Sequence, residues 1–299
     1  MQQTGTTCEF SNSDSWVILS PIEQSIKRKI ESVGTPLKDW DINIYRGVLT
    51  GYNEAFIIST EKRDEILANC QSDDERKRTE ELIRPILRGR DIKRYGYNWA
   101  GLYLIATFPS RHYDIEKYPA VKNYLLSFGI ERLEQTGKEH NVNGEKIKAR
   151  KKTNNKWFET QDSISYWEDF SKPKIIWKRI GSILRFSYDN MEHLGLDSTC
   201  FATGVNIEFV CCVLNSQMGH YLLKDSPKTG TGDLLISVQA IEPIRIPHID
   251  WETNMNFKKL LMDLIKDNSL AKEQEISRKV FELYDLSPNE QSYIEKNFT

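Results

Sequence analysis

The first chemistry that the residues suggest is that of a Mg²⁺-dependent nuclease, because Asp91 and Lys93 form an acid-x-Lys element. In such sites a carboxylate holds the metal ion and the lysine helps to orient or activate water. The reaction also needs a second carboxylate on an adjacent strand, but the nearest candidates, Asp73, Asp74 and Glu80, fall in a charged stretch of helical composition. We therefore keep an endonuclease centred on Asp91 and Lys93 as an alternative interpretation.

Other catalytic and metal-binding patterns are missing from the sequence, which contains no G-x-G-x-x-G, P-loop, H-E-x-x-H or G-x-S-x-G motif. The histidines are scattered, at His112, His140, His193, His220 and His248. The five cysteines lack metal-ligand spacing, and their odd number excludes a complete disulfide framework, which favours a reducing compartment such as the cytoplasm. The sequence predicts no catalytic residue, metal site or cofactor in this chain.

Positive charge is concentrated in the middle of the chain. Residues 84–185 contain 21 Lys or Arg and 11 Asp or Glu, a net charge of +10 in a chain whose net charge is −2. Three segments carry most of this charge: RPILRGRDIKRY (residues 84–95), KIKARKKTNNK (146–156) and KPKIIWKRIGSILR (172–185). Lysine and arginine neutralise phosphates, and Arg, Lys and Asn also read base edges in the major groove. This distribution favours nucleic acid as the partner.

The elements that must position these residues are helices and strands in mixed order. A helix is predicted over residues 21–33, with Ser20 as its N-cap and Glu23 completing a capping box. Strands are predicted over 42–49, 55–59, 102–108, 174–177, 183–188 and 199–204. Helices are predicted over 61–69, 74–83, 118–133, 207–223, 256–280 and 289–297, with a turn over 50–53, a glycine loop over 228–233 and an extended segment over 243–247.

Two stretches stand outside this pattern. Residues 134–155 contain almost no apolar side chains and are predicted to form a long exposed loop, and residues 1–15 are small and polar. The longest apolar runs are far shorter than the ~20 residues that cross a bilayer, so no membrane partner is expected.

Several segments resemble, in order, the TaqI-like C-terminal specificity domain of adenine-specific DNA methyltransferases and single-chain type IIG restriction-modification enzymes. The matching segments are YRGVLTGYNEAFII (45–58), LIRPILRGRDIKRY (82–95), YLI (103–105), DIEKYPAVKNYL (114–125), WFE (157–159), FSKPKIIW (170–177), VLNSQMGHYLLK (213–224), IRIP (244–247) and VFELYDLSPNE (280–290). They extend over most of the chain, and LTGYNEAF together with LRGRDIKRY is the most specific combination.

The resemblance implies a mixed α/β body whose loops enter the major groove of DNA beside a flipped base. Family members normally carry an upstream catalytic domain, with an N-P-P-Y-type motif and a glycine-rich loop for S-adenosylmethionine, and this sequence contains neither. S-adenosylmethionine and Mg²⁺ are therefore expected only for the parent enzyme, a bacterial DNA adenine methyltransferase or type II restriction endonuclease that acts in phage defence. The chain is expected to be its specificity part, either a fragment or a separate subunit that partners a methyltransferase or nuclease domain.

We therefore expect an α+β protein with three parts. Residues 1–40 form an N-terminal linker with a short helix, 41–250 a DNA target-recognition domain built on a mixed β-sheet with flanking helices, and 251–299 a helical C-terminal segment. The expected partner is double-stranded DNA. An adaptor that only holds a methyltransferase subunit through its acidic helical ends, and a reader of single-stranded RNA, remain alternatives.

The reading loops vary between family members, so the stretch least like the family, residues 134–156, is the expected base reader. The residues expected to contact DNA there are Lys146, Lys148, Arg150, Lys151, Lys152, Asn154, Asn155 and Lys156, with Lys178 and Arg179 on the same face. More family-like residues are expected to position the DNA backbone or to hold the fold: Thr50, Asn53, Arg88, Arg90, Lys93 and Arg94.

Overall fold

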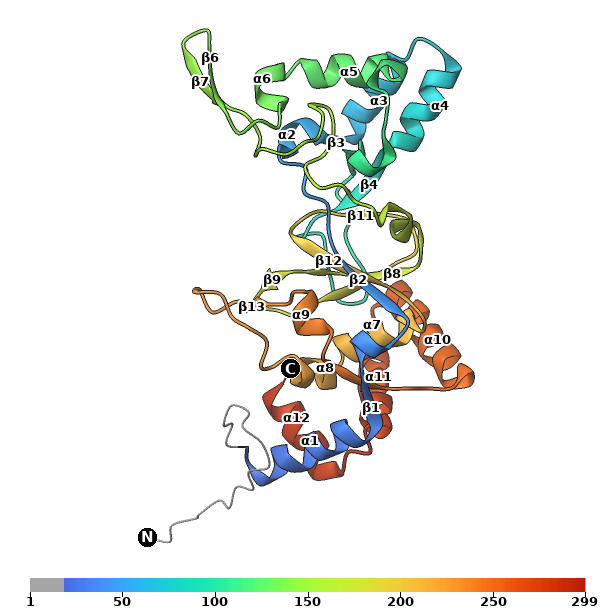
Figure 1. Cartoon of the computed structure of the whole chain (residues 1–299). Helices are drawn as coiled ribbons and strands as arrows, with labels where there is room; N and C mark the ends of the chain where they lie inside the picture. Colours follow the sequence, from blue (N-terminus) through green and yellow to red (C-terminus); the bar gives the residue numbers. More distant parts are fainter. Residues whose placement is uncertain (1–18, 299) are drawn as a thin grey trace.

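A four-stranded antiparallel sheet lies in the middle of the molecule and separates two hydrophobic cores. In this computed structural model, which describes residues 19–298, the strands follow the order β10 (Phe186–Asp189), β8 (Lys174–Lys178), β12 (Thr199–Gly204) and β2 (Ile42–Arg46). Successive side chains of a strand point to opposite faces. Along β12, Cys200 and Ala202 enter one core while Phe201 enters the other. This sheet therefore joins an upper and a lower lobe (Figure 1).

The upper lobe is built around a second four-stranded sheet. Its strand order is β11 (Leu194–Gly195), β4 (Ile83–Leu87), β5 (Leu102–Ile105) and β3 (Ile57–Ser59), with only β11 and β4 parallel. Its helices are α2 (Asn53–Phe56), α3 (Thr60–Ala68), α4 (Asp73–Leu82), α5 (Pro119–Leu126) and α6 (Ile130–Leu133), with 3-10 turns at Pro109–Arg111, Ile115–Lys117 and Trp167–Ser171.

A hairpin projects from the upper lobe. Strands β6 (Glu139–Val142) and β7 (Glu145–Lys148) pair antiparallel, with Val142 opposite Glu145 at the turn. Asn143 and Gly144 make this turn with φ values of 52° and 89°, as the two-residue Asn-Gly turns of hairpins require. The expectation of a long exposed loop over residues 134–155 is therefore wrong.

The lower lobe is mainly helical. It contains α1 (Pro21–Val33), α7 (Ile207–Asn215), α8 (Gln217–Leu222), α9 (Val238–Ile241), α10 (Trp251–Asp267), α11 (Leu270–Leu283) and α12 (Pro288–Asn297), with a 3-10 turn at Leu37–Asp39. Two short ribbons complete it: β1 (Gly34–Pro36) with β14 (Arg245–Pro247), and β9 (Ile180–Gly181) with β13 (Leu234–Leu235). All nine residues of α7 are buried, and α1 and the C-terminal helices share their core with α7.

The α+β class with flanking helices and a helical C-terminal tail is confirmed, as is the first helix with its Ser20–Glu23 capping box. Three predicted helices are each broken once. Gly129, at φ 83°, separates α5 from α6, and left-handed Asn268 separates α10 from α11. Ser216 begins α8 by accepting a hydrogen bond from the Gly219 amide, and so divides the helix predicted over 207–223.

Four predicted strands are shorter than expected. Those predicted over 42–49 and 102–108 end at Arg46 and Ile105, residues 55–56 belong to α2, and the strand predicted over 183–188 begins at Phe186. The boundaries at 40 and 250 stay predictions, and residues 1–18 of the first segment lie outside the described residues. Within residues 19–298, no helix is long and apolar enough to cross a membrane.

Candidate nucleic-acid interface

Arg150 anchors the chain that follows the β6–β7 hairpin. Its side chain is buried and donates to four backbone carbonyls: Nε to Leu133 at 2.8 Å, Nη1 to Thr50 and Glu159 at 2.8 Å each, and Nη2 to Trp157 at 2.6 Å. Burial lowers the pKa of Arg150 to about 10, so it stays charged at neutral pH. The expectation that Arg150 contacts DNA is corrected, because its donors are directed into the protein.

Polar side chains around Arg150 fix the rest of this segment. The Gln135 amide donates to the carbonyls of Glu159 (3.0 Å) and Lys156 (3.2 Å), and accepts from the Thr153 hydroxyl (2.8 Å). The half-buried Asn155 amide donates to the carbonyls of Thr160 and Gln161. The expectation that Asn155 reads a base is therefore corrected as well: its amide nitrogen closes the loop.

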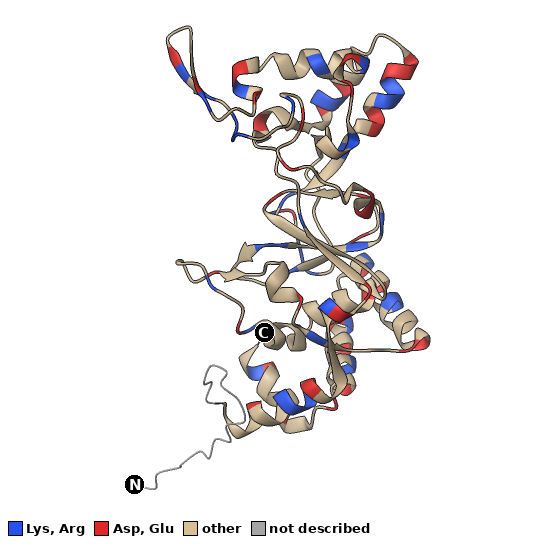
Figure 2. Cartoon of the chain, in the orientation of Figure 1, with Lys and Arg blue, Asp and Glu red and all other residues tan. Residues whose placement is uncertain are grey.

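The other polar residues of the 146–156 segment face outward. Lys146, Lys148, Lys151, Lys152, Asn154 and Lys156 are all exposed, and no ion pair engages any of these lysines within residues 19–298. Figure 2 shows basic residues continuing from β7 into the chain that follows it. The buried arginine thus fixes a loop whose remaining cations are directed to solvent.

Three of these lysines line a groove together with residues from other parts of the upper lobe. The groove, of about 580 Å³, is lined by Gly51, Tyr52, Arg132, Gly137, Lys148, Ala149, Arg150, Lys151, Lys152 and Gln161. Five of its ten lining residues are cationic and none is acidic. The guanidinium of Arg132 lies over the Tyr52 ring and donates to its hydroxyl at 3.3 Å. This surface attracts an anion.

The turn at residues 50–53 forms one side of the groove. The buried Thr50 hydroxyl donates to Asn53 Oδ1 at 2.7 Å and accepts from the Tyr52 amide at 3.1 Å. Gly51 has φ 78°, and a Cβ there would lie 2.7 Å from Gln161 Oε1. Thr50 therefore holds the turn, one of the two roles expected of it, and Asn53, whose side chain is exposed, stays a prediction as a DNA contact.

A continuous line of contacts connects this groove to the lower lobe. The amide of Asp162, next in sequence to the groove residue Gln161, donates to the Leu49 carbonyl at 3.2 Å, and the Asp197 amide donates to the Val48 carbonyl at 2.9 Å. Next in sequence, the Ser198 hydroxyl accepts from the Gly89 amide at 3.2 Å. Gly89 in turn lies against Lys178, because a Cβ at this glycine would be 3.0 Å from Lys178 Cγ.

Arg179 belongs to the same neighbourhood, since its amide donates to the Ser198 carbonyl at 3.0 Å. Lys178 is exposed, Arg179 is half-buried, and Arg90 next to Gly89 is exposed. Lys178, Arg179 and Arg90 therefore remain predictions as DNA contacts, in a position connected to the groove.

The other arginines of the 84–95 segment, Arg84, Arg88 and Arg94, are held in ion pairs. Arg88 donates through Nε and Nη2 to both oxygens of Asp91, at 3.0 and 2.8 Å, and its amide adds a bond of 2.8 Å. Burial alone would raise the pKa of Asp91, but these bonds hold it below its usual range. Arg88 thus has a structural role, one of the two expected of it, and Asp91, the metal ligand that the nuclease interpretation requires, has both oxygens engaged.

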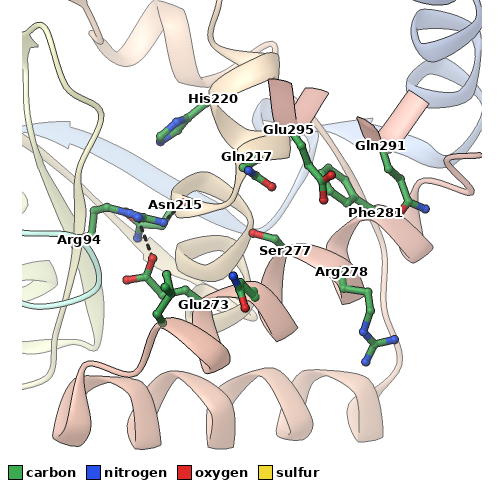
Figure 3. A pocket seen from close by; sticks show the side chains of 12 residues that line it. Arg94, Asn215, Gln217, His220, Glu273, Ser277, Arg278, Phe281, Gln291 and Glu295 are labelled. Carbon is green, nitrogen blue, oxygen red and sulfur yellow. Dashed lines mark hydrogen bonds and ion pairs between the residues drawn. The ribbon is translucent and has the colours of Figure 1, made fainter. Parts of the chain in front are cut away.

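Arg94 lies away from the groove, in a hollow of the lower lobe of about 630 Å³ (Figure 3). It donates to the Asn215 carbonyl at 2.9 Å and pairs with Glu273 of α11 at 2.7 Å. Burial lowers the pKa of His220 in the same hollow to about 4, so it is neutral at pH 7. Arg94 therefore attaches the C-terminal helices, which is the fold-holding role of the two expected of it, while Lys93 is half-buried and stays a prediction as a DNA contact.

Two polar residues of the groove, Arg132 and Gln161, were not anticipated from the sequence. Arg132 lies within a segment predicted only as helix, and the isolated Gln161 carries no motif. Within residues 19–298, no group of three His, Cys, Asp or Glu could hold a metal ion, and Cys70, Cys200, Cys211 and Cys212 are free.

Comparison with known proteins supplies a context for this surface. A family model described as the TaqI-like C-terminal specificity domain matches residues 84–244. A search of curated proteins finds no match.

The fold is similar to that of MmeI, a type IIL restriction-modification enzyme solved in complex with DNA, with a TM-score of 0.56 and 10% identity over 89% of this chain. It is also similar to that of the type IIG restriction endonuclease BpuSI, with a TM-score of 0.52 and 13% identity over 92% of this chain. The chain spans about a third of each enzyme, 36% and 31% respectively.

Proposed function

Because the chain belongs to the TaqI-like C-terminal specificity domain family, we propose that it recognises a specific sequence in double-stranded DNA for a restriction-modification enzyme. One observation carries this proposal: a groove lined by five cations and no acid, held by the buried Arg150 and bordered by exposed lysines. Such a fixed cationic surface binds phosphates without having to order a flexible loop first.

The β6–β7 hairpin is the element proposed to enter the major groove, which admits a two-stranded ribbon. Lys148, Lys151 and Lys152 bind phosphates at its base, where they line the groove. Asn154 is the proposed base reader, because it is exposed and an asparagine amide can pair with the edge of adenine. Lys178, Arg179 and Arg90 extend the phosphate contacts towards the lower lobe.

The parent enzyme proposed here is a type IIG-like adenine methyltransferase, whose catalytic domain is the partner of this chain. That domain would bind S-adenosylmethionine and Mg²⁺. The Asp91 carboxylate, held by Arg88, does not fit a magnesium site, so no step of the proposal uses the metal on this chain. A cytoplasmic location and a role in phage defence belong to the same proposal.

The test is duplex binding measured by fluorescence anisotropy over a range of salt concentrations. The logarithm of the binding constant falls linearly with the logarithm of the salt concentration. A variant with Lys148→Ala, Lys151→Ala and Lys152→Ala should make this slope shallower by about three units, because three phosphate contacts are lost. The matched control carries Lys77→Ala, Lys259→Ala and Lys266→Ala, which remove the same charge from exposed positions of α4 and α10.

Equal slopes for the two triple variants would contradict the assignment of the groove. A wild-type chain that is folded and ignores duplex DNA in dilute buffer would overturn the function itself and favour the adaptor interpretation. Tighter binding of single-stranded RNA in competition would favour the RNA alternative, and Mg²⁺-dependent nicking of plasmid DNA the nuclease. Selection of duplexes from a random pool should yield one enriched sequence.

A further inference from the structure

A second projecting element, on the lower lobe, lies outside the surface described so far. Strands β9 and β13 pair antiparallel, Leu234 with Gly181 and Leu235 with Ile180, and form a short ribbon. The turn at residues 182–185 follows β9, and the glycine loop at residues 228–233 precedes β13. Figure 1 shows this ribbon and the β6–β7 hairpin projecting on the same side of the molecule.

The ribbon is attached directly to the proposed DNA surface. β9 follows Lys178 and Arg179 in the chain, and the Arg179 carbonyl accepts a hydrogen bond from the Ile236 amide at 2.8 Å. The side chain of Lys178 lies against Gly181, with Nζ 3.7 Å from the position that a Cβ would take. The ribbon therefore extends the line of contacts that connects the groove to Lys178.

The 228–233 loop has an ordered backbone and an open outer surface. The Thr229 amide donates to the Asp233 carbonyl at 2.8 Å and the Gly232 amide to the Thr229 carbonyl at 2.9 Å. A Cβ at Gly230 or Gly232 would meet no atom within 4 Å, and Gly232 has φ 86°. Glycines at such positions let a ligand approach the backbone closely.

The loop presents one cation beside this bare backbone. Lys228 is exposed, and no ion pair engages it within residues 19–298. Neither nearby acid forms an ion pair with Lys228 among residues 19–298: Asp225 pairs with Lys224 at 2.6 Å, and Asp233, which keeps its charge, accepts from the Thr231 hydroxyl at 3.2 Å. The loop therefore offers a lysine and exposed backbone, the combination that phosphate oxygens bind.

The neighbouring turn presents an apolar side chain instead. Ile183 is 58% exposed, between exposed Ser182 and buried Leu184. A branched apolar side chain at the end of a projecting ribbon can contact the methyl group of thymine or insert between base steps.

We propose that the β9–β13 ribbon is a second DNA-contacting arm, in which Lys228 and the backbone of Gly230 and Gly232 bind phosphate and Ile183 contacts a base. This inference rests on the proposed function and adds to it a contact on the lower lobe. The duplex then spans both lobes, held by the β6–β7 hairpin at one end and by the ribbon at the other.

The experiment uses the duplex that the wild-type chain selects from a random pool. Lys228→Ala should weaken binding severalfold and lower the salt slope by about one unit. Ile183→Ser should weaken binding to that duplex while leaving the salt slope unchanged, because it removes no charge. Lys259→Ala and Leu270→Ser are the matched controls, the latter at an apolar side chain that is 70% exposed.

A hydroxyl-radical footprint separates the two arms. Each ribbon variant should lose protection at one end of the site and keep it at the other, and the triple variant at Lys148, Lys151 and Lys152 should show the converse. If the wild type binds and the triple variant weakens binding, yet both ribbon variants match their controls, the second arm is refuted and the proposed function stands. If the wild-type chain does not bind duplex DNA, the proposed function itself is refuted, and the second arm with it.

Discussion

The 146–156 and 84–95 segments are both short and rich in cations, but the fold uses them in opposite ways. The first has six cations and no acid, and the second has five cations and one acid. In the first, Arg150 alone is buried and the remaining cations are exposed. In the second, Arg84, Arg88 and Arg94 pair with Glu192, Asp91 and Glu273.

The difference follows from what surrounds each segment. Backbone carbonyls satisfy Arg150, and among residues 19–298 no ion pair neutralises the lysines around it. The 84–95 segment joins the upper sheet to β10 and, through Arg94, to α11, and carboxylates engage three of its arginines. We infer that the first segment binds DNA and the second mainly holds the two lobes together.

The largest expected effect is that of Arg150→Ala. The substitution leaves four buried carbonyls without their donor, and we expect it to lower the free energy of unfolding by about 3 to 5 kcal/mol. Urea denaturation measures the loss, and hydrogen exchange should place it in residues 133–160.

Lys151→Ala is the control for this prediction. Its exposed side chain should change the stability by less than about 0.5 kcal/mol. Arg150→Ala with wild-type stability would mean that the loop is not held from inside, and the contrast between the two segments would disappear.

Asp91 gives the next largest effect. Asp91→Asn weakens the paired bonds from Arg88 and should cost about 2 kcal/mol at pH 7. The pKa of Asp91 is lowered by folding, so its contribution is present above its unfolded pKa of about 4 and is lost as the pH falls further. Urea midpoints measured between pH 2 and 7 should therefore fall less steeply for the variant than for the wild type.

Asp162→Asn is the control, because folding shifts the pKa of Asp162 in the opposite direction from that of Asp91. Burial raises the pKa of Asp162, so acid relieves an unfavourable charge there instead of removing a favourable one. If the urea midpoint of Asp91→Asn falls with decreasing pH as steeply as that of the wild type, the ion pair with Arg88 does not hold the 84–95 segment.

How far the sequence predicts these roles depends on how local the signal is. The capping box of Ser20 and Glu23 lies within one helical turn, and the first helix was predicted to the residue. The breaks at Gly129, Ser216 and Asn268 each depend on one residue in an otherwise helical run, and they were missed. The β6–β7 hairpin was missed because polar strands carry no apolar alternation, although its Asn-Gly turn was present in the sequence.

The candidate site was predictable as a region but not residue by residue. Charge counts located residues 146–156, yet nothing local distinguishes Arg150 from Lys151. The partners of Arg150 include Thr50 and Leu133, which only the tertiary fold brings near. For the same reason, Arg132 was not anticipated in the groove.

The smallest predicted effect distinguishes Arg90 from Arg88, two residues away. Arg90 is exposed beside Gly89 and without an ion pair among residues 19–298, whereas Arg88 is held by Asp91. Arg90→Ala should lower the salt slope of DNA binding by about one unit with the stability unchanged, and Arg88→Ala should lower the stability with the slope unchanged.

Both outcomes of this last pair are informative, because salt titration counts phosphate contacts and urea denaturation measures the fold. An unchanged slope for Arg90→Ala would remove Arg90 from the DNA surface, leave Lys93 as the one predicted DNA contact of the 84–95 segment, and sharpen the contrast with residues 146–156. A shallower salt slope for Arg88→Ala, with the stability of the wild type, would show that Arg88 leaves Asp91 and binds a phosphate when DNA binds. The division of roles would then hold only for the free protein.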